Sequence, residues 1–236
     1  MYYYILNYYK LINLFSIYFK FSKYYLIKYF LLKTLKMKTL IIIDFQNDFC
    51  QPTGSLYVPG AEQAKKGIIS YMEKNSKDIN QIIYTKDWHT SEDESFKKNG
   101  GIWPDHCVQN SNGAEIDKEL YDNLNKYNIH TQIFNKGTVY THEEYGAFEN
   151  FKEKEFKDDS KKWVFTNYGK DSEISIGNEN IVICGLAGDF CVMESTKNLL
   201  KHWKFNLEIL INGISSIDNG DKLKNFIKET NLKVVQ

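Results

Sequence analysis

The sequence predicts an α/β fold, with a doubly wound, mostly parallel six-stranded sheet and helices on both of its faces. Short apolar runs rich in Ile alternate along the chain with longer segments of helical periodicity. The apolar runs are typical of strands that are buried on both faces. Regular alternation of strand and helix favours parallel pairing through crossover helices.

Six segments are the predicted strands: TLIIID (39–44), INQIIYTKD (79–87), IHTQIFNK (129–136), ENIVICGL (179–186), LEILING (207–213) and LKVV (232–235). The predicted helices lie between them, at 61–74, 114–127, 192–203 and 220–230. The stretch 149–180 is densely charged and irregular in pattern. We expect this stretch to be a solvated helix or loop.

Residues 1–36 differ from the rest of the chain because they carry six Lys, no acidic residue and nine of the 17 Tyr. Lys interrupts the apolar runs before they reach the ~20 residues that a membrane span needs. No small-residue cleavage site typical of a signal peptide is present. We expect a dispensable or misassigned extension, followed by one folded domain over residues 37–236. A membrane-surface helix or an organelle address is the alternative for the extension.

The composition of the domain limits the kinds of molecule that it is expected to bind. All 30 basic residues are Lys, so no guanidinium group can grip a carboxylate or phosphate with two parallel hydrogen bonds. Residues 37–236 carry 24 Lys against 30 acids and show no stripe suited to nucleic acid. The four Cys have neither metal-ribbon spacing nor a disulfide framework, which favours a reducing compartment. We expect a cytoplasmic protein, or a nuclear one in a eukaryotic cell, with a small-molecule partner. A homo-oligomer is left open.

Three reactive side chains end predicted strands, namely Asp44, Asp87 and Lys136, and a fourth, Cys191, follows the fourth predicted strand at the start of a helix. In an open α/β sheet, ligands bind beyond the carboxyl ends of the strands. Each residue alone has a structural explanation, because an Asp before a helix is often a cap and a free Cys is often a buried hydrophobe. Together, a thiol, an ammonium and a carboxylate form a nucleophile set suited to amide hydrolysis through an acyl-enzyme.

A candidate metal site lies between the second and third predicted strands. Asp87 and His89 are two residues apart, so they point to the same side of an extended segment, and His106 follows 17 residues later. Two His and one Asp with open positions suit one divalent ion, with zinc first and iron or manganese as alternatives. A surface His and a simple turn at WPDHC are the structural alternatives.

Five motifs occur in order: IIIDFQNDFC, DWHTSEDESF, WPDHC, KGT followed by EEYGAF, and GLAGDFCV. From about residue 38 onward the chain resembles the nicotinamidase/pyrazinamidase family of isochorismatase-like cysteine hydrolases. The resemblance implies a triad of Asp44, Lys136 and Cys191, and metal binding by Asp87, His89 and His106.

The same resemblance implies further site residues. Phe49 and Trp103 would flank the substrate ring, and Tyr145 would line the pocket. A cis peptide before Ala187 would direct the backbone N–H groups of Ala187 and Cys191 into an oxyanion hole.

Two of the motifs depart from the family pattern. Asp93 stands where some members have a second metal-binding His, so it is a further candidate ligand, directly or through water. Gly188 and Phe190 replace the Thr and Tyr that are usual in the last motif.

The expected function is that of a nicotinamidase, which hydrolyses nicotinamide to nicotinate and ammonia through a cysteine thioester and feeds NAD salvage. The alternatives are a related cysteine amidohydrolase acting on another small amide, and a non-catalytic binding member of the family.

Overall fold

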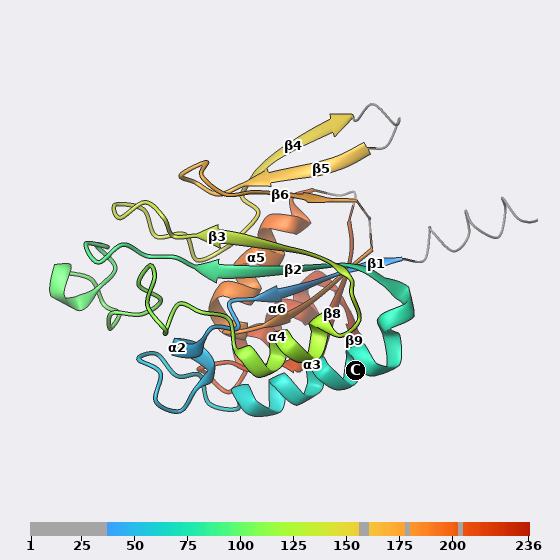
Figure 1. The fold of residues 1–236 in the computed structure, drawn as a ribbon, viewed down its shortest axis with the longest axis horizontal. Helices are drawn as coiled ribbons and strands as arrows, with labels where there is room; N and C mark the ends of the chain where they lie inside the picture. The colour runs from blue at the N-terminus through green and yellow to red at the C-terminus, as the bar shows by residue number, and fades with distance from the viewer. Residues whose placement is uncertain (1–36, 156–160, 178–179, 203–204) are drawn as a thin grey trace, which may run out of the picture. The chain divides into compact units, whose positions relative to one another are not determined.

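A computed structural model describes residues 37–155, 161–177, 180–202 and 205–236 (Figure 1). The predicted extension, residues 1–36, lies outside the described residues. The remaining chain folds around a six-stranded parallel sheet with strand order β3-β2-β1-β7-β8-β9. Its strands are β1 (Lys38–Ile43), β2 (Ile79–Asp87), β3 (His130–Lys136), β7 (Asn180–Gly185), β8 (Asn206–Ile214) and β9 (Lys233–Val235). The predicted doubly wound sheet and its six strands are confirmed.

The central strands β1 and β7 owe their position to their composition. Leu40 to Ile43 on β1 and Ile181 to Cys184 on β7 are all fully buried. Such apolar strands are stable only where both faces of the sheet are covered. β2 pairs with one side of β1 and β7 with the other, so the strand order reverses next to β1. The carboxyl ends of strands at such a reversal form the usual ligand crevice of an open α/β sheet.

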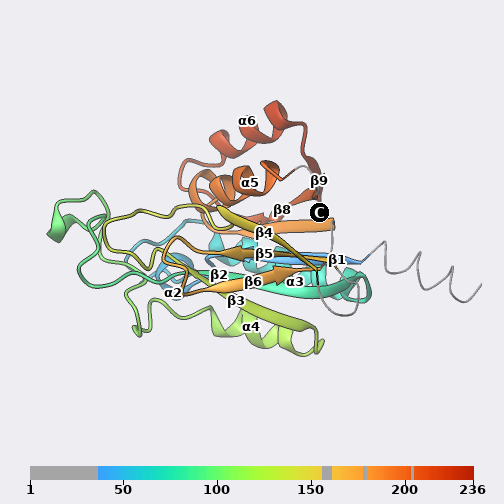
Figure 2. The same cartoon turned by 90° about the horizontal axis from the view of Figure 1, so that it is seen from above.

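Helices cover both faces of the sheet (Figure 2). One face packs against α3 (Ala61–Asn75) and α4 (Lys118–Asn125), and the other packs against α5 (Met193–Leu200) and α6 (Asp221–Thr230). α4 starts later than predicted because the Asp117 side chain caps it, accepting a hydrogen bond of 2.8 Å from Leu120 N. In the described part of the chain, no helix is long and apolar enough to cross a membrane.

A second, antiparallel sheet was not predicted. It consists of β4 (Asn150–Glu155), β5 (Lys161–Thr166) and β6 (Glu173–Ile176), with β5 in the middle. The expectation of a solvated helix or loop over 149–180 is therefore wrong. Trp163 and Phe165 on β5 oppose Ile176 and Ile174 on β6, and all four side chains are buried. This alternation at a period of two is short and lies among many Lys and Glu, which obscured it.

The small sheet is joined to the main sheet by hydrogen bonds from β3 and β2. Asn135 N on β3 donates a hydrogen bond of 2.9 Å to Ser172 Oγ, which immediately precedes β6. Gln81 on β2 donates one of 2.6 Å to the Ser175 carbonyl on β6. The buried face of the small sheet joins the same apolar cluster as Ile41 and Ile43 of β1. The buried side chains of β5 and β6 are thus part of the core that supports the main sheet.

This assignment predicts a large loss of stability from Phe165→Ala. Phe165 is fully buried and contacts the rings of Phe148, Phe151 and Phe205. Truncation of a buried Phe costs about 3–5 kcal/mol in the free energy of unfolding. Denaturant unfolding would measure this loss, with Tyr168→Ala as the control. Tyr168 is 48% exposed, so its truncation should cost about 1 kcal/mol or less. Equal, small losses in both variants would contradict the packing of β5 described here.

Candidate active site

The parallel strands bring three predicted catalytic residues together at the carboxyl edge of the sheet. Asp44 directly follows β1, Lys136 ends β3, and Cys191 lies in a helical turn (Gly188–Val192) after β7. The ammonium Nζ of Lys136 lies 2.9 Å from Asp44 Oδ2 and 3.8 Å from Cys191 Sγ. All three side chains are buried. A thiol, an ammonium and a carboxylate thus share one enclosed site.

Asp44 is held by Thr85 of the neighbouring strand. The hydroxyl of Thr85 donates a 2.6 Å hydrogen bond to Asp44 Oδ1 and accepts one of 3.1 Å from Asp44 N. Asp44 Oδ2 faces Lys136 as an ion pair but has no hydrogen-bond partner in the described residues. Burial raises the pKa of Asp44, with Lys136 acting in the opposite direction. A buried carboxylate with a raised pKa, whose oxygen lies within 4.8 Å of the Cys191 sulfur, is suited to take up a proton.

The charge state of the other two groups follows from their surroundings. Burial alone would lower the pKa of Lys136, but Asp44 and Asp87 outweigh it and raise that pKa well above its ordinary value. Burial raises the pKa of the Cys191 thiol well above its ordinary value, and Lys136 only partly offsets this. Lys136 is therefore a fixed cation, and Cys191 needs a base to become a thiolate.

The predicted metal-binding residues also lie together. Nε2 of His89 is 3.8 Å, and Nε2 of His106 is 3.9 Å, from Asp87 Oδ2. All three side chains are buried, and their donor atoms lie within 4.8 Å of one another. His89 Nε2 has no hydrogen-bond partner in the described part of the chain. Two imidazole nitrogens and a carboxylate oxygen that converge on one buried point fit a divalent ion such as zinc, iron or manganese.

The Nδ1 atoms of the two histidines contact oxygen atoms on the side away from the converging donors. His106 Nδ1 donates a 2.8 Å hydrogen bond to the carbonyl of Pro104. His89 Nδ1 lies 2.9 Å from Asp93 Oδ2, whose other oxygen accepts 3.0 Å from Ser95 N. Asp93 thus lies behind His89 rather than among the converging donor atoms. Such outer contacts fix the ring orientation and leave Nε2 free for a metal.

Asp87 connects the two halves of the site. Its Oδ1 accepts a hydrogen bond from Lys136, while its Oδ2 faces the two histidines. Burial opposes the ionisation of Asp87, but Lys136 and the histidines outweigh it and hold its pKa below the ordinary value. Asp87 and Lys136 are paired in register on adjacent strands, so the contact follows directly from the sheet.

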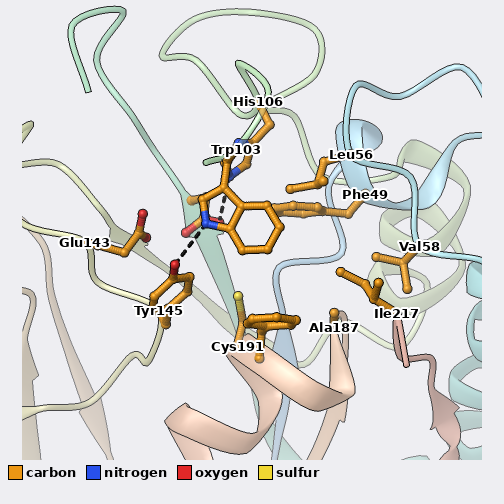
Figure 3. A pocket seen from close by; sticks show the side chains of 12 residues that line it. Phe49, Leu56, Val58, Trp103, His106, Glu143, Tyr145, Ala187, Cys191 and Ile217 are labelled. Atoms are coloured by element: carbon orange, nitrogen blue, oxygen red, sulfur yellow. Dashed lines mark hydrogen bonds and ion pairs between the residues drawn. The ribbon is translucent and has the colours of Figure 1, made fainter. Parts of the chain in front are cut away.

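A pocket opens beside the thiol (Figure 3). The Cys191 sulfur points into it, toward the indole of Trp103. Trp103 Nε1 donates a 2.9 Å hydrogen bond to the hydroxyl of Tyr145. The centroids of the Phe49 and His106 rings lie 5.4 Å apart. The predicted ring-binding residues Phe49, Trp103 and Tyr145 therefore line the same pocket as Ala187, Cys191 and two of the metal-binding residues, Asp87 and His106.

Sequence reasoning missed several lining residues: Leu56, Val58, Glu143, Phe190 and Ile217. The signal for Glu143 was present, because it stands two residues before Tyr145 in EEYGAF and shares its side of an extended segment. Its Oε2 is buried without a hydrogen-bond partner in the described residues. Leu56 and Ile217 come from loops that carry no motif, so nothing in the sequence indicated them.

The turn that carries Cys191 is held firmly. The peptide between Leu186 and Ala187 is cis, as the resemblance implied. Phe190 N and Val192 N donate to the Ala187 carbonyl at 3.2 and 3.1 Å, and Gly188 N donates to the Ser215 carbonyl at 2.8 Å. The oxyanion hole from Ala187 N and Cys191 N stays a prediction.

Comparison with known proteins adds four findings. The isochorismatase domain family matches residues 38–218. The nicotinamidase of Saccharomyces cerevisiae is 29% identical over 220 residues, which cover 82% of this chain and 94% of that protein. The pyrazinamidase of Pyrococcus horikoshii in complex with zinc is 27% identical, with a TM-score of 0.63, covering 84% of this chain and 98% of that one. PnC1 of L. infantum in complex with nicotinate is 26% identical, with a TM-score of 0.66, covering 85% and 93%.

The converging donors predict that zinc stabilises the folded protein. An ion that binds only the native state adds about 4 kcal/mol to the free energy of unfolding at a concentration 1,000 times Kd. Thermal unfolding of metal-free protein, with and without excess zinc, would show this as a higher Tm. We expect His106→Ala to lose most of the zinc-dependent rise. His130→Ala, which removes an exposed His at the start of β3, should keep it. The same zinc response in both variants would contradict the site.

Proposed function

The chain belongs to the isochorismatase domain family, and from that premise we propose that it hydrolyses nicotinamide to nicotinate and ammonia. The chain is an amidohydrolase of this family. One observation carries the narrower proposal. The buried group of Asp44, Lys136 and Cys191 faces a pocket lined by aromatic side chains, next to a set of metal donors.

The similar proteins support this substrate. The yeast relative is a nicotinamidase, and PnC1 of L. infantum has nicotinate bound. A pyridine ring is flat and apolar on its faces, which suits a position between Phe49 and Trp103. The carboxamide would then lie against Cys191. Nicotinate formed in this way would feed the salvage of NAD.

Proton transfer begins at Cys191. Asp44 takes the thiol proton, and the thiolate attacks the carboxamide carbon to form a tetrahedral intermediate. Ala187 N and Cys191 N are the proposed donors to its oxyanion. Asp44 returns the proton to the nitrogen as the C–N bond breaks, so that ammonia leaves and a thioester remains on Cys191. Water, losing a proton to Asp44, then hydrolyses the thioester and restores the thiol.

Lys136 stays charged through these steps. Its ammonium, held by Asp44 and Asp87, stabilises the thiolate 3.8 Å away once the proton has left Cys191. Asp44 therefore changes its protonation state while Lys136 provides a fixed positive charge. This division of roles follows from the raised pKa of both groups.

Asp87, His89 and His106 would hold one divalent ion, for which zinc is our first proposal and iron or manganese the alternatives. When bound, the ion supplies a Lewis acid that can accept the lone pair of a pyridine nitrogen and orient the ring. Trp103 and Tyr145, joined by their hydrogen bond, close the pocket around the ring and limit the access of water.

The central prediction concerns the two buried cysteines near the carboxyl end of β7. We expect Cys191→Ala to lower kcat for ammonia release from nicotinamide by about 10⁴-fold or more, because the nucleophile is lost. Cys184→Ala is the matched control. Cys184 is also buried, but its thiol contacts the Ile41 carbonyl and lies outside the pocket.

An ammonia assay on both folded variants would decide between the candidate functions. Turnover by Cys191→Ala at the wild-type rate would contradict the assignment of Cys191 as the nucleophile. A wild-type protein that releases ammonia from another small amide, but not from nicotinamide, would favour the related amidohydrolase. Binding of nicotinamide without any turnover would favour a non-catalytic member of the family.

The role of Asp44 as the base makes a separate prediction. Asp44→Asn keeps a group that can accept from Thr85 but cannot take up the thiol proton. General base catalysis contributes about 10²–10⁴-fold, so kcat should fall by that factor. Asp122→Asn on α4 removes an exposed carboxylate and should leave kcat unchanged. Steady-state kinetics with nicotinamide would test both, and near-normal kcat in Asp44→Asn would exclude Asp44 as the base.

A further inference from the structure

Gln46 makes contacts that the mechanism above does not use. It lies between β1 and α2 (Asn47–Cys50) and is fully buried. Its Oε1 accepts a 2.8 Å hydrogen bond from Asp87 N, and its Nε2 donates one of 2.8 Å to the Asp87 carbonyl. The same Nε2 donates 3.0 Å to the Ala114 carbonyl. One side-chain amide therefore satisfies both backbone polar groups of a proposed metal ligand.

The sheet itself does not provide these bonds. On the β3 side Asp87 pairs with Lys136, but the pairing of β2 with β1 ends at Tyr84 opposite Ile42. Beyond that point β1 turns away at Asp44, whose φ is +44°. The Gln46 amide takes the place that a further strand residue would occupy. Because a buried backbone group without a partner is costly, this contact restrains the peptide planes on both sides of Asp87.

The segment that follows β1 also contacts the loop that carries His106. Asp48 Oδ2 accepts a 2.7 Å hydrogen bond from Cys107 N, directly after His106. The carbonyl of Cys107 accepts 3.1 Å from His89 N. The residues after β1 thus contact the backbone of Asp87 at the end of β2 and the backbone next to His106.

We propose that Gln46 is a positioning residue for the metal centre. By fixing the backbone of Asp87, it keeps Oδ2 aimed at the two histidine Nε2 atoms before the ion binds. The inference rests on the proposed metal site and deepens it. An unrestrained Asp87 could rotate toward other partners, and the ion would then have to order it on binding, which weakens affinity.

The test is zinc affinity of Gln46→Met, measured by competition with a chelator at one fixed pH. Met has a similar length and apolar bulk but cannot form the three hydrogen bonds. We expect Kd to rise about 10- to 100-fold, the usual effect of losing an outer contact to a metal ligand.

Gln81→Met provides a matched control. Gln81 is also a buried Gln with three hydrogen bonds, to Thr39, Gln132 and the Ser175 carbonyl, and none of these touches the metal site. Both substitutions should lower the Tm of the metal-free protein, but only Gln46→Met should change Kd. A Kd equal to that of Gln81→Met would overturn the proposal, because Gln46 would then be merely structural.

If Gln46→Met does not fold, the zinc affinity of Gln46→Asn tests the proposal instead. Its shorter amide cannot span both polar groups of Asp87, so Kd should again rise relative to Gln81→Asn, and an unchanged Kd would overturn the proposal. A wild-type protein without zinc affinity would also overturn it. Zinc affinity is measured without substrate. Tight zinc binding without nicotinamide turnover would therefore contradict only the proposed function. Nicotinamide turnover by the wild type, together with an unchanged Kd in Gln46→Met, would contradict only this inference.

Discussion

The sharing of one carboxylate, that of Asp87, between a buried lysine and two histidines is the interaction on which the rest of the site depends. One oxygen holds Lys136 and the other faces His89 and His106. Lys136 in turn pairs with Asp44. With both carboxylates ionised and both histidines neutral, Asp44, Asp87 and Lys136 together carry one net negative charge in this enclosed site. Buried charge is stable only when it is paired or coordinated, so a cation at the histidines would complete the balance.

The fold supplies this arrangement through the order and register of its parallel strands. Asp87 and Lys136 are cross-strand partners at the ends of β2 and β3, and Asp44 leaves β1 beside them. Cys191 comes from the other side of β1, after β7, where the strand order reverses. The nucleophile, the base, the cation and the shared carboxylate of Asp87 thus approach one point from four strands. Their spacing is set by the sheet, and loops contribute mainly the aromatic walls of the pocket.

The sequence was sufficient for those parts of the structure that local pattern determines. Runs such as TLIIID and ENIVICGL could only be stable as strands buried on both faces, and reactive residues at their ends had to meet at one edge. The small sheet escaped because its inward side chains, such as Phe165 and Ile174, are few and are surrounded by charge. Leu56 and Ile217 escaped because loop conformation depends on tertiary contacts. The role of Gln46 was not predicted for a different reason. A polar residue that bonds to backbone groups far along the chain leaves no periodic pattern in the sequence.

The most direct measurement of the shared carboxylate is a crystal structure of the zinc-treated protein with anomalous data at the zinc absorption edge. The account predicts one strong anomalous peak at about 2.0–2.2 Å from Nε2 of His89, Nε2 of His106 and Oδ2 of Asp87. Lys136 would still contact Oδ1 of Asp87. A peak bound by Asp93 in place of Asp87, or an Asp87 turned away from Lys136, would contradict the claim that one carboxylate joins the metal centre to the catalytic residues.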